Sequence, residues 1–351
     1  MLKNDEYFIF YILYKMTSLT SFTQNDTTYT ITIDKNIDSN ILESIFLNTC
    51  ICKHQILTDN REFIMEVIKV CNNIYDIIEL ISYEFTNDRE IIMTAVKRDA
   101  NILGYASDEL KNDREIVMTA VIENGDAIEY ASDELKNDRE IVMTAVKNYG
   151  LSFAYASKEL QNDREIVMIA VKNDGWALQF ASDELKNDRK IVMTAVENYG
   201  NALEYASDEL KNDREIVMTA VKNYESDYGM PLEFASDKLK NDRDIIMTVV
   251  KRDGRLLKYA SDELKNARDI VMAAIKKNGN ALEYASDELK NDREIVMNAI
   301  KKRGKALKFA SEELKNDREL VMKAIEKCTD AIKYASLELR DSDEFLLYRR
   351  H

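Results

Sequence analysis

Hydrophobic residues follow two helical patterns that alternate along the chain. In the first, apolar residues stand at positions i, i+1, i+4 and i+5, which share one face of a helix. One copy consists of Ile216, Val217, Ala220 and Val221. In the second, apolar residues stand at i, i+3 and i+7, as do Leu203, Ala206 and Leu210. Neither pattern alternates as a half-buried strand does, so both segments are predicted to be amphipathic helices.

This pair of patterns returns every 25 residues, and an arginine marks each return. The arginines are Arg89, Arg114, Arg139, Arg164, Arg189 and Arg214, and then Arg243, Arg268, Arg293 and Arg318. The step from Arg214 to Arg243 is 29 residues, which places an insertion at about residues 225–228. Neither helix can bury its apolar face alone, so successive units must stack. The predicted fold is an all-α solenoid of 25-residue helix-turn-helix repeats.

Polar residues and glycines predict where the two helices of a unit begin and end. Asn112 and Glu115 have the spacing of a capping box, so the first helix is expected over about residues 113–123. A glycine such as Gly125 follows it, and we expect this glycine to end the helix with a positive φ. The second helix is expected to start from an N-cap at Asp126 and, in other copies, at Asn201 and Asn280. Pro231 falls at its first position, where proline is tolerated.

The repeats do not cover the whole chain. Residues 59–345 form the predicted array of about 11 units, which starts from a degenerate copy at Arg61, and residues 346–351 form a tail. Residues 1–58 fit no repeat and are predicted to be a small α+β cap or module. Within them residues 28–33 alternate as a strand would, and residues 41–47 favour a helix. The apolar run 7–14 has the features of neither a signal peptide nor a membrane anchor.

The strings ALEYASDELKNDREIVMTAVKNYG and their variants resemble the helical repeat family known as domain of unknown function 4116. The elements A-S-x-E-L-K-x-D and A-V-K-x-x-G carry the resemblance across roughly residues 59–345. It implies an intracellular repeat protein of the kind found in large viruses and protists. The family has no established activity, so no site residue is carried over.

The net charge of −15 argues against binding of nucleic acid or an anionic membrane by the whole surface. Three of the four cysteines lie near the N-terminus, and their number does not suit a disulfide framework, so a reducing cytoplasmic location is expected. Cys50, Cys52, His54 and Cys71 lack the spacing of a zinc site. No catalytic motif occurs, so we expect no enzyme activity, no metal and no cofactor.

Three residue types recur in every unit and have two interpretations each. The arginines could line an anion-binding groove, but each has an acidic neighbour on both sides in most copies, which favours ion pairs within or between units. The methionine four residues after each arginine is expected in the core. The aromatic ladder that includes Tyr105, Tyr130 and Tyr155 could stack bases, but packing between units is favoured.

Sequence variation concentrates at the turn around the glycine of each unit, which we call the loop edge. Because such positions are where repeat proteins bind, they are the candidate partner surface. Large apolar residues replace Asn or Asp in two neighbouring copies: Tyr149, Leu151, Phe153 and Trp176. They are candidate anchors for a protein partner, with a hydrophobic staple onto the first helix as an equal alternative.

A basic cluster follows in the C-terminal third. Residues 251–340 hold 21 basic and 16 acidic residues, in contrast to the acidic remainder. The candidate anion-binding residues are Arg252, Arg255, Lys276, Lys277, Lys301, Lys302, Arg303, Lys305 and Lys308, accompanied by Lys258. A solvated face, an acidic partner, head-to-tail self-association and RNA remain open interpretations. The leading hypothesis is a non-enzymatic scaffold for an unknown protein; anion or nucleic-acid binding and a purely structural role are the alternatives.

Overall fold

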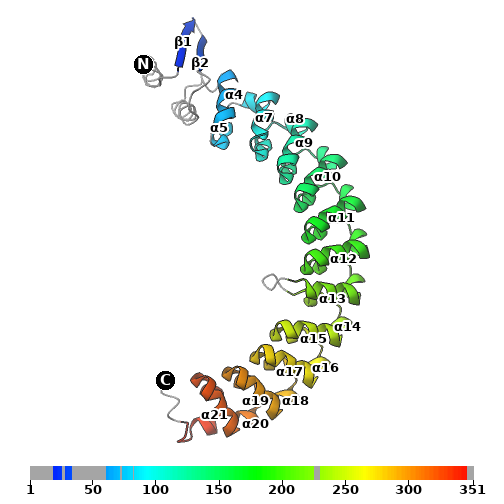
Figure 1. The fold of residues 1–351 in the computed structure, drawn as a ribbon, viewed down its shortest axis with the longest axis vertical. Helices are drawn as coiled ribbons and strands as arrows, with labels where there is room; N and C mark the ends of the chain where they lie inside the picture. Colours follow the sequence, from blue (N-terminus) through cyan, green and yellow to red (C-terminus); the bar gives the residue numbers. More distant parts are fainter. Residues whose placement is uncertain are drawn as a thin grey trace. The chain divides into compact units, whose positions relative to one another are not determined.

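The computed structural model describes residues 19–25, 28–33, 61–71, 73–81, 83–224 and 230–345. It divides into two compact units, residues 1–173 and 174–351, which are described separately. The predicted all-α repeat fold is confirmed in both. Figure 1 shows the helices of consecutive repeats lying side by side in chain order within each unit. No helix in the described part of the chain is long and apolar enough to span a bilayer.

The first unit holds a two-stranded antiparallel sheet of β1 (Leu19–Asn25) and β2 (Thr28–Ile33). The strand predicted at residues 28–33 is thus confirmed, whereas the helix predicted at 41–47 lies outside the described residues. The α-helices of this unit are α4 (Arg61–Val70), α5 (Ile74–Leu80), α6 (Tyr83–Thr86), α7 (Arg89–Val96), α8 (Asp108–Lys111), α9 (Arg114–Glu123), α10 (Arg139–Asn148) and α11 (Arg164–Asn173). Its 3₁₀ helices are η1 (Ala100–Tyr105), η2 (Gly125–Tyr130), η3 (Leu135–Asn137), η4 (Gly150–Tyr155) and η5 (Leu160–Asn162).

The second unit repeats the same scheme. Its α-helices are α12 (Arg189–Asn198), α13 (Arg214–Lys222), α14 (Asp237–Lys240), α15 (Arg243–Arg252), α16 (Asp262–Lys265), α17 (Arg268–Lys277), α18 (Asp287–Lys290), α19 (Arg293–Lys302), α20 (Glu312–Lys315), α21 (Arg318–Lys327) and α22 (Leu337–Arg340). Its 3₁₀ helices are η6 (Gly175–Phe180), η7 (Leu185–Asn187), η8 (Gly200–Tyr205), η9 (Leu210–Asn212), η10 (Pro231–Glu233), η11 (Gly254–Tyr259), η12 (Gly279–Tyr284), η13 (Gly304–Phe309) and η14 (Thr329–Tyr334). Pro231 opens η10, as predicted, and the insertion at 225–228 lies outside the described residues.

The core of each repeat consists of the residues that the periodicity selected. Ile116, Val117, Ala120 and Val121 of α9 are fully buried, and the equivalent residues of α10, α11, α12, α13, α15, α17, α19 and α21 are buried as well. The second predicted helix buries the expected residues but is not one helix. It is a 3₁₀ helix followed by a short helical turn, with an Ala-Ser step in extended conformation between them. The break occurs because the N–H of Ser132 donates to the carbonyl of Lys111 in the preceding repeat, and so leaves its own helix.

The long helices are capped one residue later than the sequence suggested. Asp113, and not Asn112, is the N-cap of α9, and its Oδ1 accepts from the N–H groups of Glu115 (3.0 Å) and Ile116 (3.1 Å). The predicted capping box is therefore wrong. The N-cap of the 3₁₀ helix η2 is likewise Asn124, two residues before the predicted Asp126.

The glycines of the loop edge are required for a different reason from the one predicted. None of Gly125, Gly175, Gly200, Gly254, Gly279 and Gly304 adopts a positive φ. Instead, a Cβ at each would overlap the carbonyl oxygen of an alanine in the next repeat; at Gly279 it would lie 2.6 Å from the oxygen of Ala299. In these six repeats glycine thus permits the close approach of the next repeat, whereas alanine, Ala100, opens the equivalent helix η1.

One repeat lacks its cap, and restoring the cap should stabilise the protein. Ala267 stands at the N-cap of α17, where it offers no side-chain hydrogen bond. We expect Ala267→Asp to raise the free energy of unfolding by about 1 kcal/mol, because an aspartate would accept from the first-turn N–H groups. Urea unfolding followed by circular dichroism measures the gain. Ala267→Asn, which caps without charge, should retain most of it, and an unchanged or lower stability would contradict the prediction.

Candidate functional site

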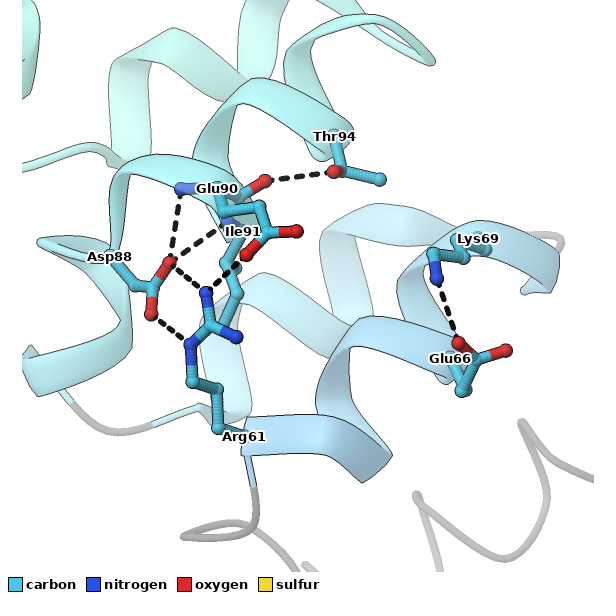
Figure 2. Close-up of polar contacts among 7 residues, drawn as sticks. All are labelled: Arg61, Glu66, Lys69, Asp88, Glu90, Ile91 and Thr94. Atoms are coloured by element: carbon cyan, nitrogen blue, oxygen red, sulfur yellow. Dashed lines mark hydrogen bonds and ion pairs between the residues drawn. The ribbon is translucent and has the colours of Figure 1, made fainter.

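The arginines at the starts of the long helices join successive repeats. In Figure 2, the Arg61 guanidinium reaches Asp88 (2.5 Å) and Glu90 (2.7 Å) of the next long helix. The same double pairing joins Arg89 to Asp113 and Glu115, Arg114 to Asp138 and Glu140, Arg139 to Asp163 and Glu165, Arg189 to Asp213 and Glu215, Arg214 to Asp242 and Asp244, Arg268 to Asp292 and Glu294, and Arg293 to Asp317 and Glu319. The ion-pair interpretation is therefore confirmed, and these guanidinium groups do not form an open anion groove.

The aspartates of this ladder serve two purposes at once. The guanidinium of Arg89 holds the pKa of Asp113 below its ordinary value, although partial burial opposes the shift and backbone N–H groups assist it. Asp113 also caps α9, so one carboxylate both starts its helix and receives the arginine of the preceding repeat. The arginine side chains are about half exposed, so each ion pair adds little to the free energy of unfolding. The main effect of the pairs is to align each repeat with the next.

A second ladder consists of asparagine, serine and glutamate, and the sequence analysis did not identify it. The Asn112 side chain accepts from the hydroxyl of Ser132 and donates to the carboxylate of Glu134 in the next repeat. The same set recurs at Asn87, Asn137, Asn241, Asn266, Asn291 and Asn316. The recurrent N-D-R and A-S-x-E strings carried this signal, but the asparagine was assigned to the capping box.

The four candidate partner-binding residues have different environments. Phe153 is fully buried, so the hypothesis that it anchors a partner is wrong: it fills the core position that leucine or isoleucine occupies in other copies. Leu151 is half-buried, and Tyr149 is 42% exposed. In the second unit, Trp176 is half-buried and stacks on Tyr199, with ring centroids 5.3 Å apart. Trp176 therefore packs on a residue of the next repeat. The hydrophobic staple proposed from the sequence instead concerned packing onto the first helix.

An exposed isoleucine that the sequence analysis missed lies near Tyr149. Ile122, near the end of α9, is 56% exposed. The Asn148 side chain, directly before Tyr149, donates to the Ile122 carbonyl (2.8 Å), so the two apolar residues lie on adjoining repeats at the loop edge. The signal was present in the sequence, because the equivalent residue is lysine in the next two copies, Lys147 and Lys172.

The candidate anion-binding residues fall into two groups. Arg252, Arg255 and Lys305 are engaged: Arg252 with backbone carbonyls, Arg255 with Asp253 (2.6 Å) and Lys305 with Asp330 (2.9 Å). Exposed side chains without an ion pair among the described residues are Lys276, Lys277, Lys301, Lys302, Arg303 and Lys308. The structure therefore does not gather all nine residues into one site.

Part of this basic region does form a pocket. It has a volume of about 440 Å³ and is lined by Tyr224, Arg252, Asp253, Arg255, Lys277 and Asn278. Burial raises the pKa of Tyr224, and the Arg255 guanidinium lowers the pKa of Asp253. Arg252 at the end of α15 and Lys277 at the end of α17 thus line the same pocket as the Asp253 carboxylate.

Metal-ligating side chains do not cluster in the described part of the chain. Residues 61–71, 73–81, 83–224 and 230–345 contain no group of three histidine, cysteine or acidic side chains placed to hold a metal ion. Cys50, Cys52 and His54 lie outside the described residues. Cys71 is buried at the end of α4.

The model of the family described as a domain of unknown function (DUF4116) matches the chain nine times, in segments most of which overlap the next. These are residues 60–111, 88–136, 113–161, 138–186, 163–211, 188–228, 226–265, 267–315 and 297–340. From residue 88 to residue 188 successive matches start 25 residues apart, in step with the arginine ladder. No curated protein is significantly similar to the chain.

Proposed function

Since the chain belongs to the DUF4116 family of repeats, we propose that it is a non-enzymatic scaffold that binds another protein along the loop edge. The observation that carries the proposal is the exposure of Ile122 and Tyr149 on adjoining repeats of the first unit. Lysine stands at the position of Ile122 in the next two copies, and Asn124 and Asp174 stand at that of Tyr149, so a repeat can fold without either side chain. Tyrosine recurs at the second position in Tyr199 and Tyr224. Exposed apolar and aromatic groups at the centre of a polar surface are typical anchors of protein interfaces.

The surroundings of this pair favour a protein over a small molecule or a polyanion. Neither side chain lines the pocket at the end of α15, whereas small ligands bind in concave sites. Lys147 and Glu123 are exposed beside them and supply both signs of charge. An apolar centre with a mixed polar rim is the usual anatomy of a protein interface.

The test replaces each residue by the one found in another copy, Ile122→Lys together with Tyr149→Asp. These changes keep the repeat sequence, so the melting temperature should stay unchanged while binding of the natural partner falls by about tenfold or more. Affinity capture with the unaltered chain identifies the partner, and titration of the purified pair measures the loss.

A matched control comes from the second unit. Leu337 of α22 is 68% exposed where other copies have aspartate, so Leu337→Asp removes an exposed apolar side chain away from the proposed surface. Partner binding should survive this change. A partner lost equally from both variants would contradict the location, a lower melting temperature of the double variant would assign the pair to packing, and the absence of any captured partner would favour a purely structural role.

A further inference from the structure

The pocket at the end of α15 has the chemistry of an anion site, and its lining comes from three consecutive repeats. Tyr224 follows α13, Arg252 and Asp253 end α15, and Lys277 and Asn278 end α17. Three cationic side chains face one carboxylate, so the lining carries a formal charge of about +2 in a chain whose net charge is −15.

Arg252 is fixed in place before any ligand arrives. Its Nη1 donates to the carbonyls of Val221 and Lys222 (both 3.0 Å), and its Nη2 donates to the carbonyl of Tyr224 (3.2 Å). The guanidinium also stacks on the Tyr224 ring, 4.2 Å from its centroid. A guanidinium has five N–H donors, so these three bonds leave two for another acceptor. Such a preorganised cation loses little conformational entropy on binding.

The hydrogen bonds from Arg252 to backbone carbonyls give this arginine a structural role, but Arg255 and Lys277 have no such role in the described part of the chain. In other repeats a shorter asparagine at this position, such as Asn148 or Asn173, donates to the carbonyls that end the preceding helix. Arg98 does so where the preceding step is also longer than 25 residues. The longer arginine thus bridges a wider gap. Arg255 and Lys277 make no contact of this kind among the described residues.

Arg255 and Lys277 are cations with N–H donors that are not bonded to the described residues. Asp253 accepts from Nε and Nη2 of Arg255, which holds this guanidinium over the turn and leaves its Nη1 without a bond to the described residues. Lys277 is exposed and has no ion pair there. Two cations with unused donors, next to a fixed third, are the arrangement by which proteins hold a phosphate group.

We propose that this pocket binds the phosphate group of a small phosphate monoester, with Arg255 and Lys277 as its principal contacts and Arg252 as a fixed charge behind them. The pocket volume of about 440 Å³ accommodates a molecule of that class, and the three cationic side chains line this one open hollow. Tyr224 is only 7% exposed and its ring carries Arg252, so it does not serve as a platform for a nucleic-acid base. The proposal is independent of the protein-binding surface of the first unit.

Titration calorimetry of the full chain with inorganic phosphate and with ribose 5-phosphate tests the proposal. We expect one saturable site for ribose 5-phosphate, with binding at least as tight as that of inorganic phosphate. Arg255→Gln and Lys277→Gln should each weaken it by about tenfold, because each removes a charged hydrogen bond. Lys302→Gln is the matched control: Lys302 ends α19 as Lys277 ends α17, but it does not line the pocket, so the affinity should change less than about twofold.

Four results would overturn the proposal. They are the absence of saturable binding at low salt, an equal loss of affinity in Lys302→Gln, binding of inorganic phosphate without the sugar phosphate, and a site for single-stranded RNA that survives Lys277→Gln and has a steep salt dependence. The last result would indicate a charged face that binds a polymer. Because no partner protein enters the assay, its failure leaves the scaffold function untouched.

Discussion

Replacement of Gly125 by alanine should destabilise the protein by about 3 kcal/mol. The new Cβ would lie less than 3.0 Å from the carbonyl oxygen of Ala145 and 3.1 Å from the backbone nitrogen of Tyr149. Both obstacles are backbone atoms of the next repeat, so no side-chain rotation can relieve the overlap. The two repeats must separate, and the apolar surface between them then becomes less well packed. Urea unfolding of the variant and the unaltered chain measures the loss.

Gly104 provides the matched control in the preceding repeat. A Cβ there would meet only the ring of Tyr130, at 3.1 Å, and the equivalent residue in other copies already has a side chain, as Glu129 does. Gly104→Ala should therefore change the free energy of unfolding by less than about 1 kcal/mol, and the lower backbone entropy of the unfolded chain favours a gain. Equal losses for the two variants would show that close approach is not the reason for Gly125.

Acid should unfold the array in a steep transition below about pH 4, the ordinary pKa of aspartate. Ladder aspartates in both units have a lowered pKa in the folded chain: Asp88, Asp113, Asp138, Asp163, Asp213, Asp242, Asp292 and Asp317. For Asp113 the largest cause is the hydrogen bond from Arg89. A group whose pKa is lowered by folding stabilises the fold above its unfolded pKa, and this stabilisation is lost as the pH falls through the folded pKa.

Thermal unfolding at about pH 7, 4 and 3 measures this loss. Because the same carboxylate recurs in successive repeats, the individual losses add up in a chain whose repeats stabilise one another. General repulsion between positive charges at low pH is the competing cause, and about 0.5 M salt screens it. If salt restores the melting temperature at pH 3, repulsion explains the transition; if the loss persists, the protonated caps and ion pairs explain it.

The features that were predictable from the sequence are those that depend on period. The spacing of Ile116, Val117 and Ala120 identified the core because burial on one helical face requires that spacing, and all three are fully buried. The arginine ladder followed from the acidic neighbours of each arginine. Pro231 was placed correctly because its fixed φ and missing N–H restrict it to a helix start.

The errors arose where contacts with the next repeat override local preference. Asn112 is a good N-cap by type, but its side chain is used by Ser132 and Glu134 of the next repeat. The second helix breaks because the Ser132 N–H bonds to a neighbouring repeat. Phe153 was assigned to the surface because it differs from other copies, although with Ala156 and Leu160 it has the i, i+3, i+7 spacing of the second apolar pattern. Ile122 lies within the first helix, whereas the loop edge as defined from the sequence comprises only the turn around the glycine.

The reach of the arginine ladder determines how such a chain can change in length. The ladder bonds named above end in the adjacent repeat, and Arg214 keeps this pairing even though its partners Asp242 and Asp244 lie 28 and 30 residues ahead. Excision of residues 113–137 would bring Asn112 directly before Asp138, so that Arg89 met Asp138 and Glu140 instead of Asp113 and Glu115. The junction would be chemically the same as before. Recombination between copies of the repeat within the gene can therefore lengthen or shorten the protein by whole units and keep the arginine pairs at each junction.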